Sequence, residues 1–89
     1  MNNKVAVQIK YLSGFDKKTG CREEMLAFCE GSCLKDVIDW LNGKYYFELP
    51  NAKMMLVYNN MGWLQLPEKL ATKLKEKNTI LLLEPLEGG

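Results

Sequence analysis

The chain contains no histidine among its 89 residues, and this absence narrows the functions that it can perform. Histidine is the commonest general base in enzymes and the commonest zinc ligand. A self-contained Ser-His-Asp or Cys-His catalyst is therefore excluded. We expect a protein that another protein acts upon, or that completes another protein's active site, rather than a whole enzyme.

The chain also lacks an excess of either charge and any long apolar run. Lysine and arginine number 12 against 11 aspartates and glutamates, which gives a net charge of +1. Nucleic-acid binding would need a basic excess, and a bilayer span would need roughly 20 consecutive apolar residues. An early Lys4 and the alternating pattern after it argue against a signal peptide. We expect a cytoplasmic protein with no nucleic-acid or membrane partner.

Cysteine is sparse and its spacing is unfavourable for a metal. Cys21, Cys29 and Cys33 form no Cys-x-x-Cys pair, so with no histidine we expect no zinc site. A disulfide between Cys29 and Cys33 is conceivable, but a reducing cytoplasm favours free thiols. We favour the interpretation that these residues pack as small hydrophobic side chains.

The residues that are present indicate a single folded domain, since 47% are hydrophobic. Val5 to Tyr11 alternates apolar and polar residues, which predicts a half-buried strand. Ser13 to Gly20 is rich in turn residues and is expected to be a loop. Arg22 to Phe28 reads as a second strand, so the first part of the chain is predicted to be a hairpin.

A helix is predicted after Gly31, because apolar residues then recur at helical spacing. Ser32 is the expected N-cap, with Cys33 as the alternative, and Gly43 is the expected stop. The spacing i, i+3, i+4 and i+7 places four residues on one face of this helix. They are Leu34, Val37, Ile38 and Leu41.

The second half of the chain predicts two or three further strands. Met54 to Tyr58 reads as a strand, and Trp63 to Leu66 as a short one. Pro67 suits the first turn of a short helix that carries Leu70 and Leu74. Thr79 to Leu83 is an unbroken apolar strand, which predicts burial on both faces and a central place in the sheet.

Met54 and Met55 are adjacent in a predicted strand, so one is expected to face the core and the other to face away. The outward methionine and its neighbours are a candidate docking patch, because methionine adapts to varied partners. Core packing is the expected role of most of the other methionines.

The order of elements predicts an α+β fold in which one main helix covers a mixed sheet of four to five strands. A short second helix completes the set. If the last strand is central, it pairs with the first, which is the arrangement of the β-grasp.

The chain resembles the MoaD/ThiS sulfur-carrier proteins, which share ubiquitin's β-grasp fold. Three stretches carry the resemblance: the apolar face of the predicted helix from Leu34 to Leu41, the sequence from Val57 to Asn60, and the sequence from Asn78 to Gly89. The resemblance is closest to the small subunit of molybdopterin synthase. It divides the chain into a β-grasp domain, residues 1–84, and a flexible diglycine tail, residues 85–89. The chain departs from that subunit at Glu84, where a first proline is usual.

The resemblance implies that the C-terminal Gly89 is the site of chemistry. An E1-like adenylyltransferase of the MoeB/ThiF type would use ATP to adenylate this carboxylate, and sulfur transfer would then convert it to a thiocarboxylate. The sulfur would pass to the large subunit of molybdopterin synthase or to another sulfur-accepting enzyme. No cofactor is expected on the carrier itself, because ATP is bound by the activating enzyme.

Each residue of the tail has an expected role. Gly88 lacks a side chain and would clear a narrow channel. Pro85 would restrict the direction of the tail, while Leu86 would fill a partner pocket and Glu87 would meet a basic group. From Glu84 to Gly89 an extended chain spans up to about 20 Å, which is enough to enter a buried active site.

Two alternatives remain open. The sulfur could serve thiamine thiazole synthesis or another pathway instead of molybdenum or tungsten cofactor synthesis. The chain could also be a ubiquitin-like modifier that is attached through Gly89, or a docking module that is never activated.

Overall fold

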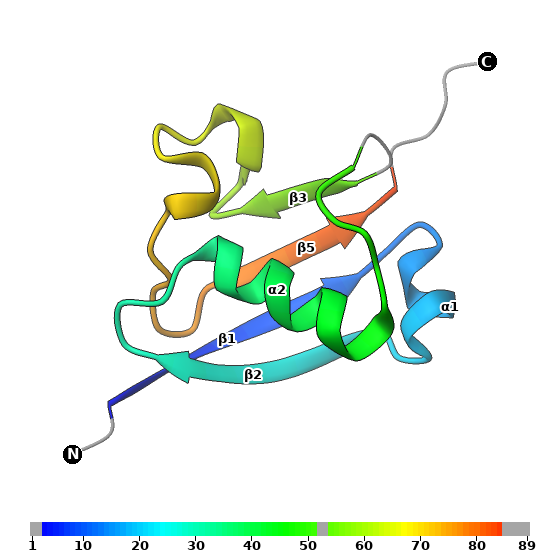
Figure 1. Ribbon diagram of the computed structural model, residues 1–89, viewed down its shortest axis with the longest axis horizontal. Helices are drawn as coiled ribbons and strands as arrows, with labels where there is room; N and C mark the ends of the chain where they lie inside the picture. The colour runs from blue at the N-terminus through cyan, green and yellow to red at the C-terminus, as the bar shows by residue number, and fades with distance from the viewer. Residues whose placement is uncertain (1–2, 52–53, 85–89) are drawn as a thin grey trace.

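The structure is a computed structural model and describes residues 3–51 and 54–84. A mixed five-stranded sheet is covered on one face by the main helix, α2 (Figure 1). The strands are β1 (Lys4–Tyr11), β2 (Glu23–Cys29), β3 (Met55–Tyr58), β4 (Met61–Gly62) and β5 (Thr79–Leu83). The helices are α1 (Phe15–Thr19) and α2 (Leu34–Tyr45), with 3-10 turns η1 (Trp63–Gln65) and η2 (Lys69–Ala71). The predicted α+β class is confirmed.

The strand order in the sheet is β2-β1-β5-β3-β4, so the last strand of the chain is central as predicted. β1 and β5 run parallel, with Gln8 opposite Thr79 and Tyr11 opposite Leu82. All other neighbouring strands are antiparallel, including the predicted hairpin of β1 and β2. The first and last strands of the chain therefore form the middle of the sheet.

The core lies between the sheet and α2. The predicted apolar face of α2 is confirmed, since each of its four residues is at most 2% exposed. Strand side chains of alternating positions complete the core, and the fully buried ones include Val7, Ile9, Leu56, Ile80 and Leu82. Within the described residues, no helix combines the length and apolar character needed to cross a membrane.

The prediction that β5 is buried on both faces is wrong. Ile80 and Leu82 are fully buried under α2, whereas Thr79, Leu81 and Leu83 are half-buried. No second layer of described residues covers their face of the sheet, as Figure 1 shows. An apolar run in this strand therefore serves the core with one face and leaves apolar side chains on the other.

The predicted end of α2 at Gly43 is also wrong, because the helix continues to Tyr45 and Tyr46 takes the left-handed cap conformation at φ 59°. Contacts of Lys44 and Tyr45 with β2, described below, favour the helical turn and offset the low helix propensity of glycine. At the other end Cys33, the alternative to Ser32, is the N-cap. The Asp36 carboxylate accepts a hydrogen bond from the Cys33 N–H at 2.8 Å.

The segment after β4 differs from the prediction in two places. Trp63 to Gln65 forms the turn η1 rather than a strand, and Leu74 lies beyond η2 rather than on a helix with Leu70. The Leu74 N–H donates to the Ser32 carbonyl at 2.9 Å, and Lys73 forms a β-bridge with Cys33. This pairing with the start of α2 explains why the segment leaves the helical conformation.

Adjacent leucines on β5 test which face of the sheet carries the core. Leu82→Ala is expected to lower the free energy of unfolding by about 2–5 kcal/mol, because it opens a cavity in the core. Leu81→Ala removes a half-buried side chain and is expected to cost about 1 kcal/mol. Urea unfolding of both variants measures the difference, and equal losses would contradict the assignment of the two faces.

Candidate functional site at the end of the central strand

All five residues of the predicted tail site, Pro85 to Gly89, lie outside the described residues. The structure does place Glu84, which follows β5 directly. Because β5 is parallel to β1, Glu84 lies at the end of the sheet where β1 leads into α1. We call Gly14, Lys18 and Glu84 the tail root. The candidate site comprises the tail root and the sheet surface beside it.

The tail root is held by an ion pair between α1 and the residue after β5. The Lys18 Nζ lies 2.5 Å from the Glu84 Oε1 and 5.1 Å from the centre of the Phe15 ring. Gly14 has φ 102°, and a Cβ at this position would lie 3.3 Å from the same Glu84 oxygen. A residue without a side chain therefore suits both the backbone conformation and the close approach of the carboxylate.

The helix α1 corrects the prediction of a loop from Ser13 to Gly20. Phe15 is 3% exposed and anchors this short helix in the core. The Thr19 hydroxyl lies 3.0 Å from the Phe15 carbonyl and 2.9 Å from the Cys21 carbonyl, and Gly20 ends the helix in the left-handed conformation. The sequence signal for α1 is the phenylalanine Phe15, followed by polar residues and by Gly20 as a helix end. The prediction missed it because the neighbouring residues are typical of turns.

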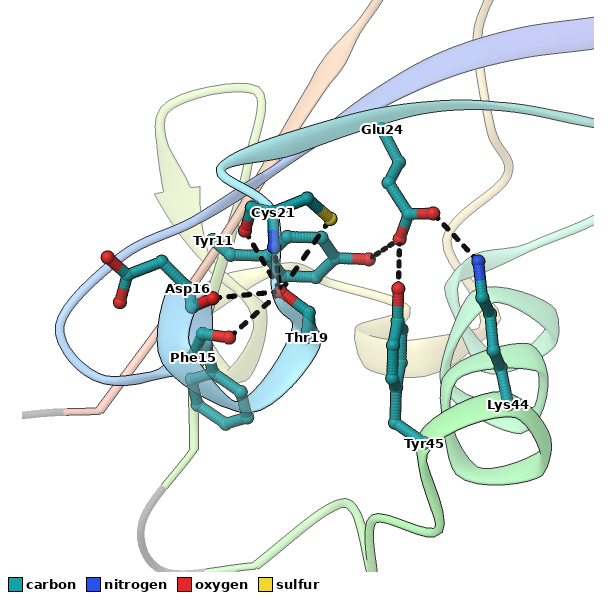
Figure 2. Close-up of polar contacts among 8 residues, drawn as sticks. All are labelled: Tyr11, Phe15, Asp16, Thr19, Cys21, Glu24, Lys44 and Tyr45. Carbon is teal, nitrogen blue, oxygen red and sulfur yellow. Dashed lines mark hydrogen bonds and ion pairs between the residues drawn. The ribbon is translucent and has the colours of Figure 1, made fainter.

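Glu24 on β2 is the centre of a polar network that joins three elements. Figure 2 shows its carboxylate facing Tyr11 of β1 and Lys44 and Tyr45 of α2. The carboxylate accepts hydrogen bonds from the Tyr11 hydroxyl at 2.5 Å, the Tyr45 hydroxyl at 2.7 Å and the Lys44 ammonium at 2.9 Å. This network fixes the last turn of α2 against the first two strands.

The network shifts the pKa values of its members. Burial raises the pKa of the Glu24 carboxyl, but the hydrogen bonds from Tyr11, Lys44 and Tyr45 outweigh burial and hold that pKa below its usual value. Burial, together with the bond to Glu24, raises the pKa of both Tyr11 and Tyr45. Both phenols therefore remain protonated donors at neutral pH, and the network holds structure together rather than transferring protons.

Aromatic rings connect this network to α1. Tyr45 stacks on Phe47 with ring centres 5.4 Å apart, and Phe47 meets Phe15 edge to face at the same distance. Tyr11 packs edge to face against Tyr45 at 6.2 Å. Such pairs contribute about 0.5–1.5 kcal/mol each beyond the area that they bury. The position of α1, and hence of Lys18, depends on rings from three parts of the chain.

An apolar surface lies on the uncovered face of the sheet beside the tail root. We call it the outer-face patch, and it consists of Leu12, Met55, Val57, Leu81 and Leu83. Met55 is opposite Leu83 and Val57 is opposite Leu81 in the pairing of β3 with β5. Leu12 and Met55 are 42% and 43% exposed. Met54, by contrast, is 6% exposed, so the predicted division of the two methionines is confirmed.

The three cysteines do not converge on a site. Cys21, Cys29 and Cys33 are all free thiols in the structure. Across residues 3–51 and 54–84, no group of histidine, cysteine, aspartate or glutamate side chains is arranged to hold a metal ion.

Comparison with known proteins bears on the fold. No protein-family model and no curated protein sequence matches the chain. Among solved structures, small archaeal modifier protein 1 from Methanosarcina acetivorans has a TM-score of 0.78 and 24% identity, over 98% of this chain and 99% of that one. The Haloferax volcanii HVO 2177 protein has a TM-score of 0.80 and 16% identity, over 97% and 88%.

A third solved structure carries a description from cofactor biosynthesis. It is molybdopterin converting factor subunit 1, as described for Pyrococcus furiosus, with a TM-score of 0.75 and 19% identity over 92% of this chain and 99% of that one. These likenesses establish the fold, which is the ubiquitin-like β-grasp found in MoaD-like and small archaeal modifier proteins. The predicted β-grasp is therefore confirmed.

The Glu24 network predicts a loss of stability in acid. Its carboxyl has a folded pKa below the unfolded value of about 4.3, so its contribution is complete above that value and is lost as the pH falls through the folded pKa. Glu24→Gln is expected to lower the free energy of unfolding at pH 7 by about 1–3 kcal/mol. It is also expected to flatten the pH dependence below about pH 4.3.

Glu23→Gln is the matched control, because Glu23 is the exposed neighbour on the same strand. Its loss of stability is expected to stay within about 0.5 kcal/mol. Urea unfolding from pH 3 to pH 7 compares the two variants. Parallel pH profiles for Glu24→Gln and the wild type would contradict the role of Glu24.

Proposed function

We propose that the protein is a sulfur carrier of the MoaD/ThiS type whose C-terminal Gly89 is the reacting residue. The observation that carries the proposal is the place of β5, the central strand of a β-grasp sheet, directly before the sequence Glu-Pro-Leu-Glu-Gly-Gly. The likeness in fold to molybdopterin converting factor subunit 1 supports it. In this role the chain is the substrate or small subunit of a sulfurtransferase system rather than an enzyme.

The first chemical step would activate the Gly89 carboxylate. A carboxylate resists nucleophiles, so its oxygen must first attack the α-phosphorus of ATP on an E1-like enzyme of the MoeB/ThiF type. Pyrophosphate leaves, and the resulting acyl-adenylate carries AMP as a good leaving group. ATP and its metal belong to the activating enzyme, and the carrier supplies only the terminal carboxylate.

The second step would introduce sulfur. The terminal sulfur of a partner's persulfide attacks the acyl carbon, the bond to AMP breaks, and an acyl disulfide forms. A second partner thiol then cleaves the sulfur–sulfur bond, which leaves a thiocarboxylate on Gly89 and a disulfide on the partner. Each bond that forms has a matching bond that breaks, and the partner's thiols supply the two electrons.

The tail residues would guide this chemistry. Gly88 and Gly89 carry no side chain and so pass a channel that excludes larger residues. Pro85 biases the preceding Glu84 toward extended backbone, which reduces the entropy that insertion would cost. Leu86 would occupy an apolar pocket of the partner, and Glu87 would meet a basic side chain.

The outer-face patch would dock on the activating enzyme. It lies at the end of the sheet where Glu84 follows β5, so one partner can cover the patch while Gly89, five residues further on, reaches up to about 18 Å beyond Glu84. Met55 and Val57 also line a groove of about 350 Å³ with Trp63 and Leu64. Apolar side chains exposed together in this way are typical of protein interaction surfaces.

The acceptor that we favour is the large subunit of molybdopterin synthase. The sequence Glu-Pro-Leu-Glu-Gly-Gly after β5 supports this branch, which would place the protein in molybdenum or tungsten cofactor synthesis. Delivery of sulfur to thiamine thiazole synthesis, or to another pathway, uses the same carrier chemistry and differs only in the acceptor.

A second candidate function is protein modification. The likeness to small archaeal modifier protein 1, at a TM-score of 0.78, favours it. The same acyl-adenylate would then react with a lysine amine of a target protein, and Gly89 would end in an isopeptide bond. A docking module that is never activated is the remaining alternative.

Intact-mass spectrometry tests the proposed function directly. After co-expression with the native host's activating and sulfur-donating enzymes, the chain is expected to gain about 16 Da, because one carboxylate oxygen is replaced by sulfur. Deletion of Gly89 is expected to abolish the gain while leaving the urea unfolding midpoint unchanged.

The same spectra separate the alternatives. Covalent adducts to lysines of other proteins would favour the modifier, and an unchanged wild-type mass would favour the docking module. A Gly89-deleted chain that still accepts sulfur would overturn the assignment of Gly89.

Substitutions of two exposed methionines, Met55 and Met25, test the docking surface. Met55→Ser is expected to raise the KM of the activating enzyme for the carrier about tenfold, which corresponds to about 1.4 kcal/mol. Met25→Ser is the control, because Met25 is 65% exposed and lies on the edge strand β2, away from the tail root. Equal KM values for the two variants would contradict docking through the outer-face patch.

A further inference from the structure

In the tail root, the Lys18 side chain joins α1 to Glu84, the residue that follows β5. These two segments are distant in the sequence. The Lys18 ammonium lies between the Glu84 carboxylate, at 2.5 Å, and the Phe15 ring, whose centre is 5.1 Å away. Cation–π contact and ion pairing both favour this one position of the ammonium. Glu84 is the last described residue before the segment that carries Gly89.

The helix that carries Lys18 is firmly anchored for its length. Phe15 is 3% exposed and packs edge to face on Phe47. The Thr19 hydroxyl lies within hydrogen-bond distance of the Phe15 and Cys21 carbonyls, to either of which it can donate its proton (Figure 2). The backbone at Lys18 is therefore fixed. Because of this, the ion pair restricts the position of the Glu84 side chain.

The backbone that leads to Glu84 is fixed from the other side. Leu83 is paired with Met55 across the sheet. The Leu12 N–H donates to the Leu82 carbonyl at 2.9 Å, which extends the contact between the ends of β1 and β5. Strand pairing thus holds the main chain as far as Leu83, and Lys18 holds the side chain of the next residue.

We propose that Lys18 is a positioning residue that sets the direction in which residues 85–89 leave the domain. Gly14 contributes to this arrangement, because its missing Cβ leaves room for the Glu84 carboxylate. The ion pair holds the Glu84 side chain in one position and so narrows the set of directions that the following residues can take. This role rests on the proposed function, because a direction matters only if a partner must receive Gly89.

The size of the effect follows from exposure. The Lys18 and Glu84 side chains are 51% and 28% exposed, so the pair is partly screened by water. An ion pair of this kind shifts an equilibrium by about two- to fivefold. A shift of this size alters how often the carboxylate enters the activating enzyme, but it does not alter the chemical step that follows.

Kinetics with the native host's activating enzyme provide the first test. Lys18→Met and Glu84→Gln are each expected to raise the KM for the carrier about two- to fivefold with kcat unchanged. Lys18→Arg keeps the charge and is expected to behave as the wild type. The charge-swapped double variant, Lys18→Glu with Glu84→Lys, is expected to recover at least half of the loss. The differences should vanish near 1 M salt, where the screening length falls to about 3 Å.

Nuclear magnetic resonance of the isolated carrier provides a test that needs no enzyme. In Lys18→Met the heteronuclear NOE of the Gly88 and Gly89 amides is expected to fall below the wild-type values, while the amides of β5 keep theirs. Unchanged NOE values together with an unchanged KM overturn the positioning role. A charge-swapped variant as impaired as the single ones also overturns it. A wild-type chain that supports no pyrophosphate release overturns the proposed function instead, and the NMR comparison then decides the positioning role alone.

Discussion

The parallel pairing of β1 with β5 is the constraint on which the rest of the structure depends. It brings the first and last strands of the chain to the middle of the sheet, with Ile9 opposite Ile80 and Tyr11 opposite Leu82. Parallel strands end on the same side, so the loop after β1 and the residue after β5 must meet there. The tail root follows from this pairing, and the antiparallel pairing of β3 with β5 adds Met55 and Val57 to the outer-face patch. The Glu24 network and its aromatic neighbours then hold α1 in place at that end.

The elements that were predictable from the sequence are those with a strong period. Alternation in Val5 to Tyr11 identified the face of β1 that is buried, and the four apolar residues of α2 were identified from their helical spacing. The central place of β5 was predicted from its apolar run and is confirmed, although the burial on both faces from which it was argued is not found. These patterns are local and repeated, so several residues of one segment indicate the same secondary structure and the same buried face. The β-grasp could be predicted because each of them agreed with it.

The features that escaped prediction depend on contacts between distant residues. A helix of five residues such as α1 has too little periodicity to detect, and it exists because Phe15 reaches a core that other segments build. The helix α2 passes Gly43 because its last turn meets Glu24. The open face of β5 could not be predicted, because it depends on which other segments of the described residues pack against the sheet. The tail residues were predicted from the sequence and the resemblance and stay a prediction, whereas Lys18 and Gly14 became visible only through their contacts with Glu84.

The register of β5 in the sheet also determines where the chain leaves the sheet. Each residue along the strand advances the chain by about 3.3 Å and turns its side chain to the opposite face. One residue inserted between Thr79 and Leu83 would therefore exchange the buried and open sets of leucines, and would move Gly89 by the same step. The distance from the core to the residues after Glu84 is thus set by β5, whose side chains alternate between the core and the open face of the sheet.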